Sequence, residues 1–254
     1  MSDTNDSFAL NSDPSDATAP TAVHTKVRFA TFNTLHGRIP KESVDIEAFV
    51  DSVADLEADF VGLQEVDKGM LRSHRVDMAA VAAGRIGGQH AFGKASRRWD
   101  LGLYGNALVS RNPVHGIEVL KLPRRGWKRE RRVAILAKLS AAGTTWNVAN
   151  THLSLHKDES AEQLAMLFGK FARINTPCVV MGDFNRHPDE VIPLVPPEWT
   201  VVDSAATFPS WDPDQRIDYL VIKNATALSS EVRCLKVSDH CALIADLESA
   251  TNSH

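Results

Sequence analysis

A series of short apolar runs, each ending in a cluster of polar residues, most constrains how this chain can fold. Apolar runs of this length with an abrupt polar end are typical of buried β-strands. The clearest are Cys178–Met181, followed by Gly182-Asp183-Phe184-Asn185, and Leu235–Val237, followed by Ser238-Asp239-His240. Burying a carboxylate or an imidazole is unfavourable unless the group is paired, whereas a strand end is a rigid support for chemistry. The pattern predicts a site where several strand ends meet.

The distribution of strands and helices favours an α/β fold of two packed sheets. Strand patterns predominate through the middle of the chain, and helices come singly rather than after every strand, which argues against a regular β/α barrel. We expect helices over residues 42–57, 76–86 and 158–174 because apolar residues recur at helical spacing. The expected strands cover residues 27–32, 60–66, 107–109, 116–120, 133–139, 145–149, 178–181, 217–222 and 242–247.

Composition and the chain ends set further bounds. The 254 residues are 43% hydrophobic and 24% charged, which is ordinary for a globular protein, and suit one domain over residues 24–249. The net charge of −4 argues against a protein that holds nucleic acid mainly by its overall field. Residues 1–23 are rich in Ser, Asp and Pro and have no secretory-signal pattern, so we expect a disordered tail there and a short tail over 250–254.

The cysteines and the hydropathy favour a cytoplasmic protein. Three cysteines without CxxC spacing indicate neither a disulfide framework nor a zinc knuckle, so a reducing setting fits best. No window approaches the length of apolar sequence that spans a bilayer, so we expect no stable membrane insertion.

Acidic and amide side chains at strand ends are candidate ligands and catalysts. Asp183 and Asn185 would share one face if strand geometry persisted, although an Asp-x-Asn sequence after a strand also fits an Asx-turn. Glu65, after Gln64 at the end of another apolar run, is equally compatible with a solvated strand end. Hard oxygen ligands of this kind suit Mg²⁺ or Mn²⁺ rather than zinc.

Two of the ten histidines lie at strand-to-loop junctions among small polar residues. These are His152 in Asn150-Thr151-His152 and His240 in Ser238-Asp239-His240. A histidine paired with a carboxylate is held in one tautomer and acts near neutral pH, and Asp218 is a candidate partner for His240. Each histidine taken alone also fits a hydrogen-bonded residue at the edge of the core.

Basic residues gather around tryptophans in two segments. Residues 121–132 carry seven Lys or Arg around Trp127, and Lys94, Arg97 and Arg98 precede Trp99. Such segments suit a phosphate backbone with stacked bases, but most charge runs are solvated loops. Arg132 differs because it enters the apolar run 133–136, where a guanidinium would grip a phosphate at two points.

Eight motifs occur in a fixed order along the chain: Thr31-Phe32-Asn33, Gln64-Glu65-Val66-Asp67, Tyr104-Gly105-Asn106-Ala107, Glu130-Arg131-Arg132, Asn150-Thr151-His152, Gly182-Asp183-Phe184-Asn185, Arg216-Ile217-Asp218-Tyr219 and Ser238-Asp239-His240. Together they resemble the endonuclease/exonuclease/phosphatase superfamily, across residues 26–248. The resemblance is closest to its small bacterial branch of unspecified substrate, which the stretch Thr207-Phe208-Pro209-Ser210 also resembles. It implies a four-layer α/β/β/α sandwich of two packed, mostly antiparallel sheets with outer helices.

The resemblance also implies a role for each motif residue. Glu65 would be the principal Mg²⁺ ligand, with Mn²⁺ as an alternative, and Asn33 and Asp239 would complete the metal site. Substrate would contact Arg132, Tyr104 and Asn106. Asp183 would activate the attacking water, Asn185 and His152 would bond phosphoryl oxygens, and Asp218 would orient His240, with the base and acid labels left open.

Three functions follow from this set of residues. The first is a Mg²⁺-dependent phosphodiesterase or phosphatase acting on a small or lipid-type phosphoester, as a monomer. The second is a metal-dependent endonuclease or exonuclease that acts on DNA or RNA. The third, an inactive binding module, is disfavoured because every motif residue keeps its functional side chain. His152 agrees with deoxyribonucleases and phosphatases rather than with repair nucleases, which the resemblance implies carry tyrosine there.

Overall fold

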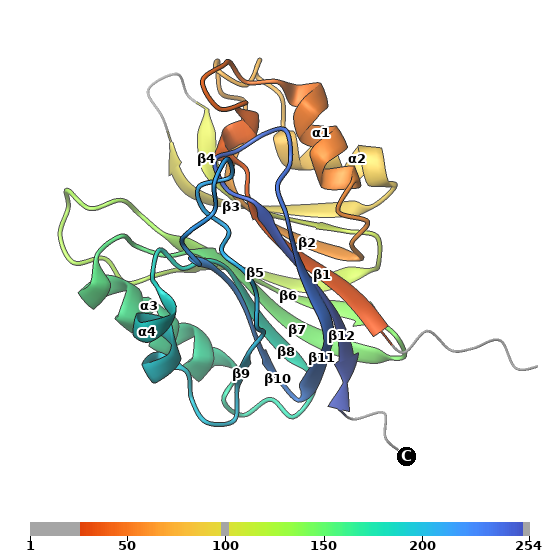
Figure 1. The fold of residues 1–254 in the computed structure, drawn as a ribbon, viewed down its shortest axis with the longest axis vertical. Helices are drawn as coiled ribbons and strands as arrows, with labels where there is room; N and C mark the ends of the chain where they lie inside the picture. Colours follow the sequence, from red (N-terminus) through yellow and green to blue (C-terminus); the bar gives the residue numbers. More distant parts are fainter. Residues whose placement is uncertain (1–25, 98–101, 251–254) are drawn as a thin grey trace, which may run out of the picture.

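A computed structural model describes residues 26–97 and 102–250 (Figure 1). The expected tail over residues 1–23, residues 251–254 of the expected C-terminal tail, and Arg98 and Trp99 of the second basic segment lie outside the described residues. No helix in the described part of the chain is long and apolar enough to cross a membrane.

Twelve strands in the described residues form two six-stranded sheets. Neighbouring strands are antiparallel except for the pairs β1/β2 and β7/β8, which are parallel. The first sheet has the order β11 (Ala225–Arg233), β12 (Ala242–Ser249), β1 (Lys26–Asn33), β2 (Phe60–Lys68), β4 (Leu103–Ser110), β3 (Gln89–Arg97). The second has the order β5 (Val114–Lys121), β6 (Val133–Ala141), β7 (Thr144–His152), β8 (Cys178–Asp183), β10 (Asp218–Lys223), β9 (Thr200–Val201).

Helix ends follow from local sequence signals. The side chains of Asp45 and Asp77 cap α1 and α2 by accepting hydrogen bonds from backbone N–H groups three residues on. The α2 helix ends at Gly87, which adopts the left-handed conformation that a helix C-terminus favours. The α-helices are α1 (Ile46–Ala54), α2 (Met78–Ile86), α3 (Lys157–Phe171) and α4 (Pro188–Val191), and two short 3₁₀ turns are η1 (Leu35–Gly37) and η2 (Ile192–Leu194).

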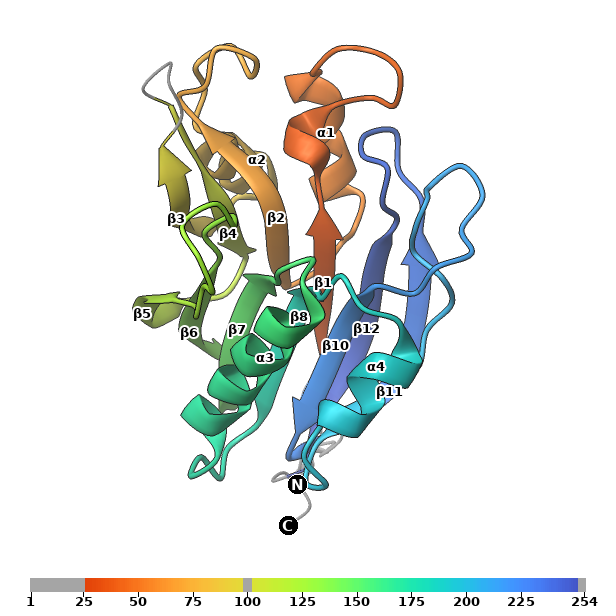
Figure 2. The same cartoon turned by 90° about the vertical axis from the view of Figure 1, so that its left-hand side faces the viewer.

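Three apolar clusters divide the molecule into four layers. One cluster packs α1 and α2 on the outer face of the first sheet, a second fills the space between the sheets, and a third packs α3 on the second sheet. In Figure 1 the α1/α2 pair and the α3/α4 pair lie on opposite sides of the sheets, and in Figure 2 α3 lies over β7 and β8. The predicted α/β/β/α sandwich is confirmed.

Three strands escaped the sequence prediction. Most of β11 is exposed at a sheet edge, so it lacks the apolar alternation that marks a half-buried strand. The other two are β3, which is the opposite edge of the same sheet, and β9, which has two residues. The edge strands β3 and β11 bury little surface on either face. They are therefore recognised by their pairing with a neighbouring strand and not by their sequence pattern.

The structure contains a disulfide that the spacing of the cysteines did not indicate. Cys234 and Cys241 form a disulfide, and Cys178 is free and buried. Spacing alone does not reveal this pair, because the β11/β12 register places Arg233 opposite Ala242 and so brings the next residues together. The disulfide closes the loop that carries His240, and it removes the support that unpaired cysteines gave to a reducing cytoplasmic setting.

Candidate active site

Strand register brings the predicted polar clusters to one edge of the two sheets. In the second sheet, His152 lies opposite Asp183 on the parallel strands β7 and β8, and Asp183 lies opposite Asp218 on β10. In the first sheet, Asn33 ends β1 beside Gln64 of β2. The neighbouring strands β7, β8 and β10 therefore each place one functional side chain at the same level of the second sheet. The sequence shows the three motifs separately and does not reveal this alignment.

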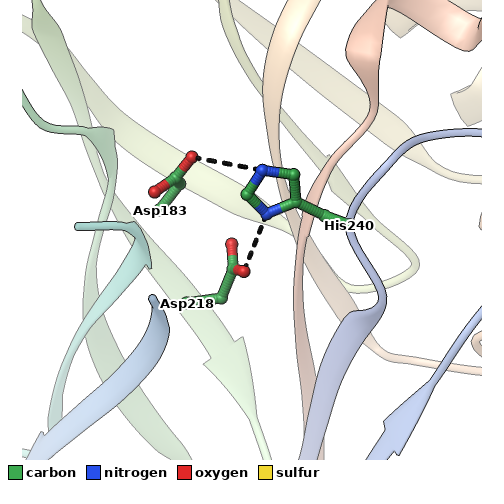
Figure 3. Close-up of side chains that lie close together, drawn as sticks. All are labelled: Asp183, Asp218 and His240. Carbon is green, nitrogen blue, oxygen red and sulfur yellow. Dashed lines mark hydrogen bonds and ion pairs between the residues drawn. The ribbon is translucent and has the colours of Figure 1, made fainter. Parts of the chain in front are cut away.

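His240 lies between two buried carboxylates (Figure 3). Its Nδ1 is 2.9 Å from Oδ2 of Asp218, and its Nε2 is 3.8 Å from Oδ2 of Asp183. The hydroxyl of Thr207 donates to the same Asp218 oxygen over 2.6 Å. Two partners on one carboxylate oxygen fix the imidazole orientation, so the sequence-predicted pairing of Asp218 with His240 is present.

Asp183 also receives contacts from other strands. The side-chain amide of Asn33 donates a 3.0 Å hydrogen bond to its Oδ2, and Nε2 of His152 lies 3.3 Å from the same oxygen. The backbone N–H of Asn185 donates to Oδ1 over 2.9 Å, which is the Asx-turn that the sequence left open. Asp183 is thus the group on which contacts from both sheets converge.

The Glu65 carboxyl has a lowered pKa. Burial by itself would raise the pKa of Glu65, but the neighbouring imidazoles of His36 and His152 outweigh burial and lower it to about 2. The His36 Nδ1 is 3.8 Å from the carboxylate, too far for a hydrogen bond, so its effect is electrostatic. The Asn33 amide reaches the other Glu65 oxygen at 3.5 Å. Glu65 is therefore ionised throughout the neutral range.

The remaining titratable groups differ in charge because their neighbours differ. Burial raises the pKa of Asp183, and the Asp218 charge adds to this while His240 opposes it. Burial would lower the pKa of His240, but the Asp218, Asp183 and Asp239 carboxylates raise it to about 10. Burial and the Arg132 charge hold the pKa of His152 well below its usual 6.5. The His240 imidazole therefore holds its proton more firmly than the His152 imidazole does.

Backbone strain is concentrated at this edge. Among the described residues, five of the eleven non-glycine residues with positive φ lie in the site segments: Leu35, His36, Glu65, Asn185 and Ser238, with φ between 43° and 79°. Each such residue costs on the order of 1–3 kcal/mol and persists only where the surroundings enforce it. Strain of this kind gathers at functional sites, which agrees with the position of the polar clusters.

The predicted substrate residues come from β4 and from the residue that precedes β6. Tyr104 is buried beneath the guanidinium of Arg72, which is 5.7 Å from its ring centre. The Asn106 amide donates to the backbone oxygen of Val133 over 2.9 Å, joining β4 to β6. Arg132 is buried, and its Nη2 lies 3.3 Å from a Glu130 carboxylate oxygen.

Two of the predicted site residues do not present their side chains to the centre. Asn185 has its side-chain amide bonded to backbone, and Asp239 is not part of the compact cluster. The Asn185 side-chain amide donates to the Leu153 carbonyl over 3.0 Å, so in this state it is bound to backbone. Asp239 is half-buried, and its backbone oxygen accepts from the N–H of Ser210. The compact cluster within 4.8 Å consists of Asp183, Asp218 and His240 and does not include Asp239.

The donor set fits a hard divalent cation. Glu65 is ionised and lies beside the Asn33 amide, and Oδ1 of Asp218 is buried without a hydrogen-bond partner. Carboxylate and amide oxygens are the ligands that Mg²⁺ and Mn²⁺ prefer. The residues therefore fit such an ion at this edge.

Sequence reasoning assigned no role to two residues that support the site. Thr207 bonds Asp218, and His36 faces Glu65 with a buried Nδ1 that has no hydrogen-bond partner. His36 lies in the 3₁₀ turn η1 just after β1, and Thr207 lies in the loop between β9 and β10. The two successive left-handed residues Leu35 and His36 just after β1 are the structural signal that distinguishes this turn.

Comparison with known proteins identifies the family. Residues 30–240 match the model of the "Endonuclease/Exonuclease/phosphatase family". The chain belongs to this family. Its members are hydrolytic phosphoesterases, and the two-sheet architecture agrees with that of solved members.

Relatives and solved structures agree with this assignment. The uncharacterized protein YbhP of Escherichia coli K12 is 28% identical over 224 residues, covering 78% of this chain and 86% of its own. An endonuclease/exonuclease/phosphatase from Beutenbergia cavernae has a TM-score of 0.73 at 20% identity, covering 89% of this chain and 72% of its own. TDP2 from D. rerio, complexed with single strand DNA product, has a TM-score of 0.67 at 15% identity, covering 89% of this chain and 100% of its own.

Proposed function

We propose that this family phosphoesterase is a Mg²⁺-dependent hydrolase that cleaves a phosphodiester or phosphomonoester by in-line attack of an activated water. The observation that carries the proposal is the convergence on Asp183 of three side chains: Asn33 from the first sheet, His152 from the neighbouring strand β7, and His240 from the loop between β11 and β12. Residues 24–249 would act as one catalytic domain, and we expect a monomer.

Asp183 is the residue best placed to accept a proton from water. Its raised pKa makes it a better base than an exposed aspartate, and Asn33 fixes its orientation. As the water oxygen bonds to phosphorus, its proton passes to Asp183 and the ester oxygen leaves with the bonding electron pair. The charged His240, held by Asp218, would donate a hydrogen bond or a proton toward the phosphoryl group or the leaving oxygen.

A divalent ion bound here would supply neutralisation of phosphate charge. Glu65 would be its principal ligand, with Asn33 beside it and Asp239 near the site, and Mn²⁺ would substitute for Mg²⁺. Neutral His152 would donate to a phosphoryl oxygen, and Asn185 would do so after leaving the Leu153 carbonyl. Tyr104, Asn106 and Arg132 would line the substrate side.

Two substrate classes remain as first and second candidates. We place a small or lipid-type phosphoester first because the net charge of −4 gives no general attraction to nucleic acid. DNA or RNA is the second candidate, and the basic residues of 121–132 and the single-strand DNA bound by the TDP2 relative favour it. Nuclease activity should fall steeply with salt through counterion release, and small-ester hydrolysis should not.

The proposal is tested with bis-p-nitrophenyl phosphate as a generic phosphodiester. We expect turnover with Mg²⁺ or Mn²⁺, no turnover in EDTA, and turnover by Asp183→Ala reduced about 10²–10⁴-fold with either metal. Binding of Mn²⁺ measured by titration calorimetry should weaken in Glu65→Gln. Equal rates in EDTA and in Mg²⁺ would contradict metal dependence, and no turnover of any phosphoester with any divalent ion would contradict hydrolysis.

A further inference from the structure

The basic segment 121–132 separates into two sets of side chains with different surroundings. The first set is neutralised by α3. Arg125 Nε is 3.1 Å from Glu162, and Arg129 Nη1 is 3.1 Å from both Asp158 and Glu159. These ion pairs hold the segment against the helix, so their arginines have a structural role.

The second set consists of Lys121, Arg124, Arg131 and Arg132. Together with Lys94 of β3, these side chains line a cavity of about 310 Å³. No carboxylate is among the described residues that line it, and Lys94, Lys121 and Arg131 form no ion pair within the described part of the chain. A concave site with unneutralised cations of one sign concentrates anions. The lining residues are Lys94, Ala95, Lys121, Leu122, Arg124, Arg131, Arg132 and Val133.

Arg132 gives independent support for a ligand in this cavity. It is only 6% exposed, and its Nε is buried without a hydrogen-bond partner. Leaving a buried charged donor unpaired is costly, so such groups are normally satisfied by protein, water or ligand. The guanidinium has one carboxylate neighbour, Glu130, at Nη2, and its Nε–H is a donor that the described residues leave without an acceptor.

The cavity adjoins the catalytic centre through β6. The backbone oxygen of Val133, which lines the cavity, accepts hydrogen bonds from Asn106 and from the Thr151 hydroxyl. Thr151 directly precedes His152, and the Arg132 charge acts on His152. The cavity is therefore linked to the catalytic centre through Val133 and Thr151, while Asp183, Asp218 and His240 are not among the residues that line it.

We propose that this cavity is a subsite for a second phosphate group of the substrate. The inference rests on the proposed function and sharpens it: preferred substrates carry another phosphate close to the scissile one. The second phosphate has the same chemistry whether it belongs to a nucleic-acid backbone or to a small bisphosphate. Phosphoesters with a single phosphate would be hydrolysed with a higher KM because they leave the cavity empty.

The test compares Lys94→Ala/Lys121→Ala with the matched control Lys128→Ala, which removes an exposed cation of the same segment outside the cavity lining. Pyrophosphate binding in EDTA, measured by calorimetry, should weaken at least tenfold in the double variant and less than twofold in the control. This readout does not need turnover, so it is independent of the proposed hydrolysis. Equal affinity in the wild type and the double variant would overturn the subsite.

Kinetics then distinguish the sources of the second phosphate. The substrates are a thymidine tetranucleotide, the p-nitrophenyl ester of thymidine 5′-phosphate carrying a 3′-phosphate, and bis-p-nitrophenyl phosphate. We expect the double variant to raise KM about tenfold for at least one of the first two and to change bis-p-nitrophenyl phosphate hydrolysis less than twofold. A rise for the tetranucleotide alone assigns a nucleic-acid backbone, and a rise for the nucleotide ester assigns a small bisphosphate. Equal change on all three substrates would contradict the subsite.

Discussion

The side-chain amide of Asn33 donates a 3.0 Å hydrogen bond to the carboxylate of Asp183, which lies 150 residues away in the other sheet. Asn33 ends β1 and Asp183 ends β8, so this bond joins the two sheets at their common edge. The same amide approaches Glu65 at 3.5 Å. One side chain therefore fixes the distance between the candidate metal ligand and the candidate base.

Replacing Asn33 should impair catalysis more than stability. We expect Asn33→Ala to lower turnover about 10–100-fold, as loss of outer contacts to metal-site carboxylates does. The matched control is Asn147→Ala, a buried asparagine of β7 that bonds Thr176 away from the site. Rates on bis-p-nitrophenyl phosphate and urea unfolding of both variants check this. Equal rates for the two variants would show that the Asn33 contact does not matter for turnover.

Removing the base or the charged imidazole should abolish most of the chemistry. We expect Asp183→Ala and His240→Ala each to reduce kcat about 10²–10⁴-fold, the contribution typical of a positioned acid or base. Circular dichroism should show an unchanged fold. Either variant retaining near-wild-type rates would disprove the role assigned to that residue.

The stability of the metal-free protein should depend on pH through His240. Its pKa is about 10 in the folded state and near 6.5 in an unfolded chain, so the folded state alone keeps the proton between these values. The stabilisation is complete below pH 6.5 and is lost as pH rises through 10. Urea unfolding in EDTA should show a free energy of unfolding that falls over this interval. Asp218→Asn should flatten the fall, and an unchanged slope would contradict the assigned cause.

The Cys234–Cys241 disulfide should stabilise the loop that carries His240. Closing a loop of this length in the unfolded chain contributes about 2 kcal/mol. We expect Cys234→Ser/Cys241→Ser to lower the free energy of unfolding by about that amount, measured by urea unfolding, and to lower turnover because His240 is held less rigidly. The double variant should be insensitive to reductant. If reductant also left the free energy of unfolding of the wild-type protein unchanged, the result would contradict this role.

The predicted fold follows from local signals because buried strands carry continuous apolar runs and the α1 and α2 helices carry caps. The runs ending at Asn33, His152 and Asp183 are recognisable for this reason. The exposed edge strand β11 is not, since its residues bury little surface and its pairing depends on β12. The same dependence hides the disulfide, whose partners meet only through that register.

The sequence by itself determined which side chains are available at strand ends and the family to which they belong. Only the tertiary structure decided how they act. Asn33 joins Glu65 to Asp183. The α3 helix neutralises Arg125 and Arg129, whereas Lys121 and Arg131 line a cavity. The physical reason is that charge pairing and hydrogen bonding depend on distances of a few ångströms. Residues far apart along the chain reach such distances only when the two sheets pack.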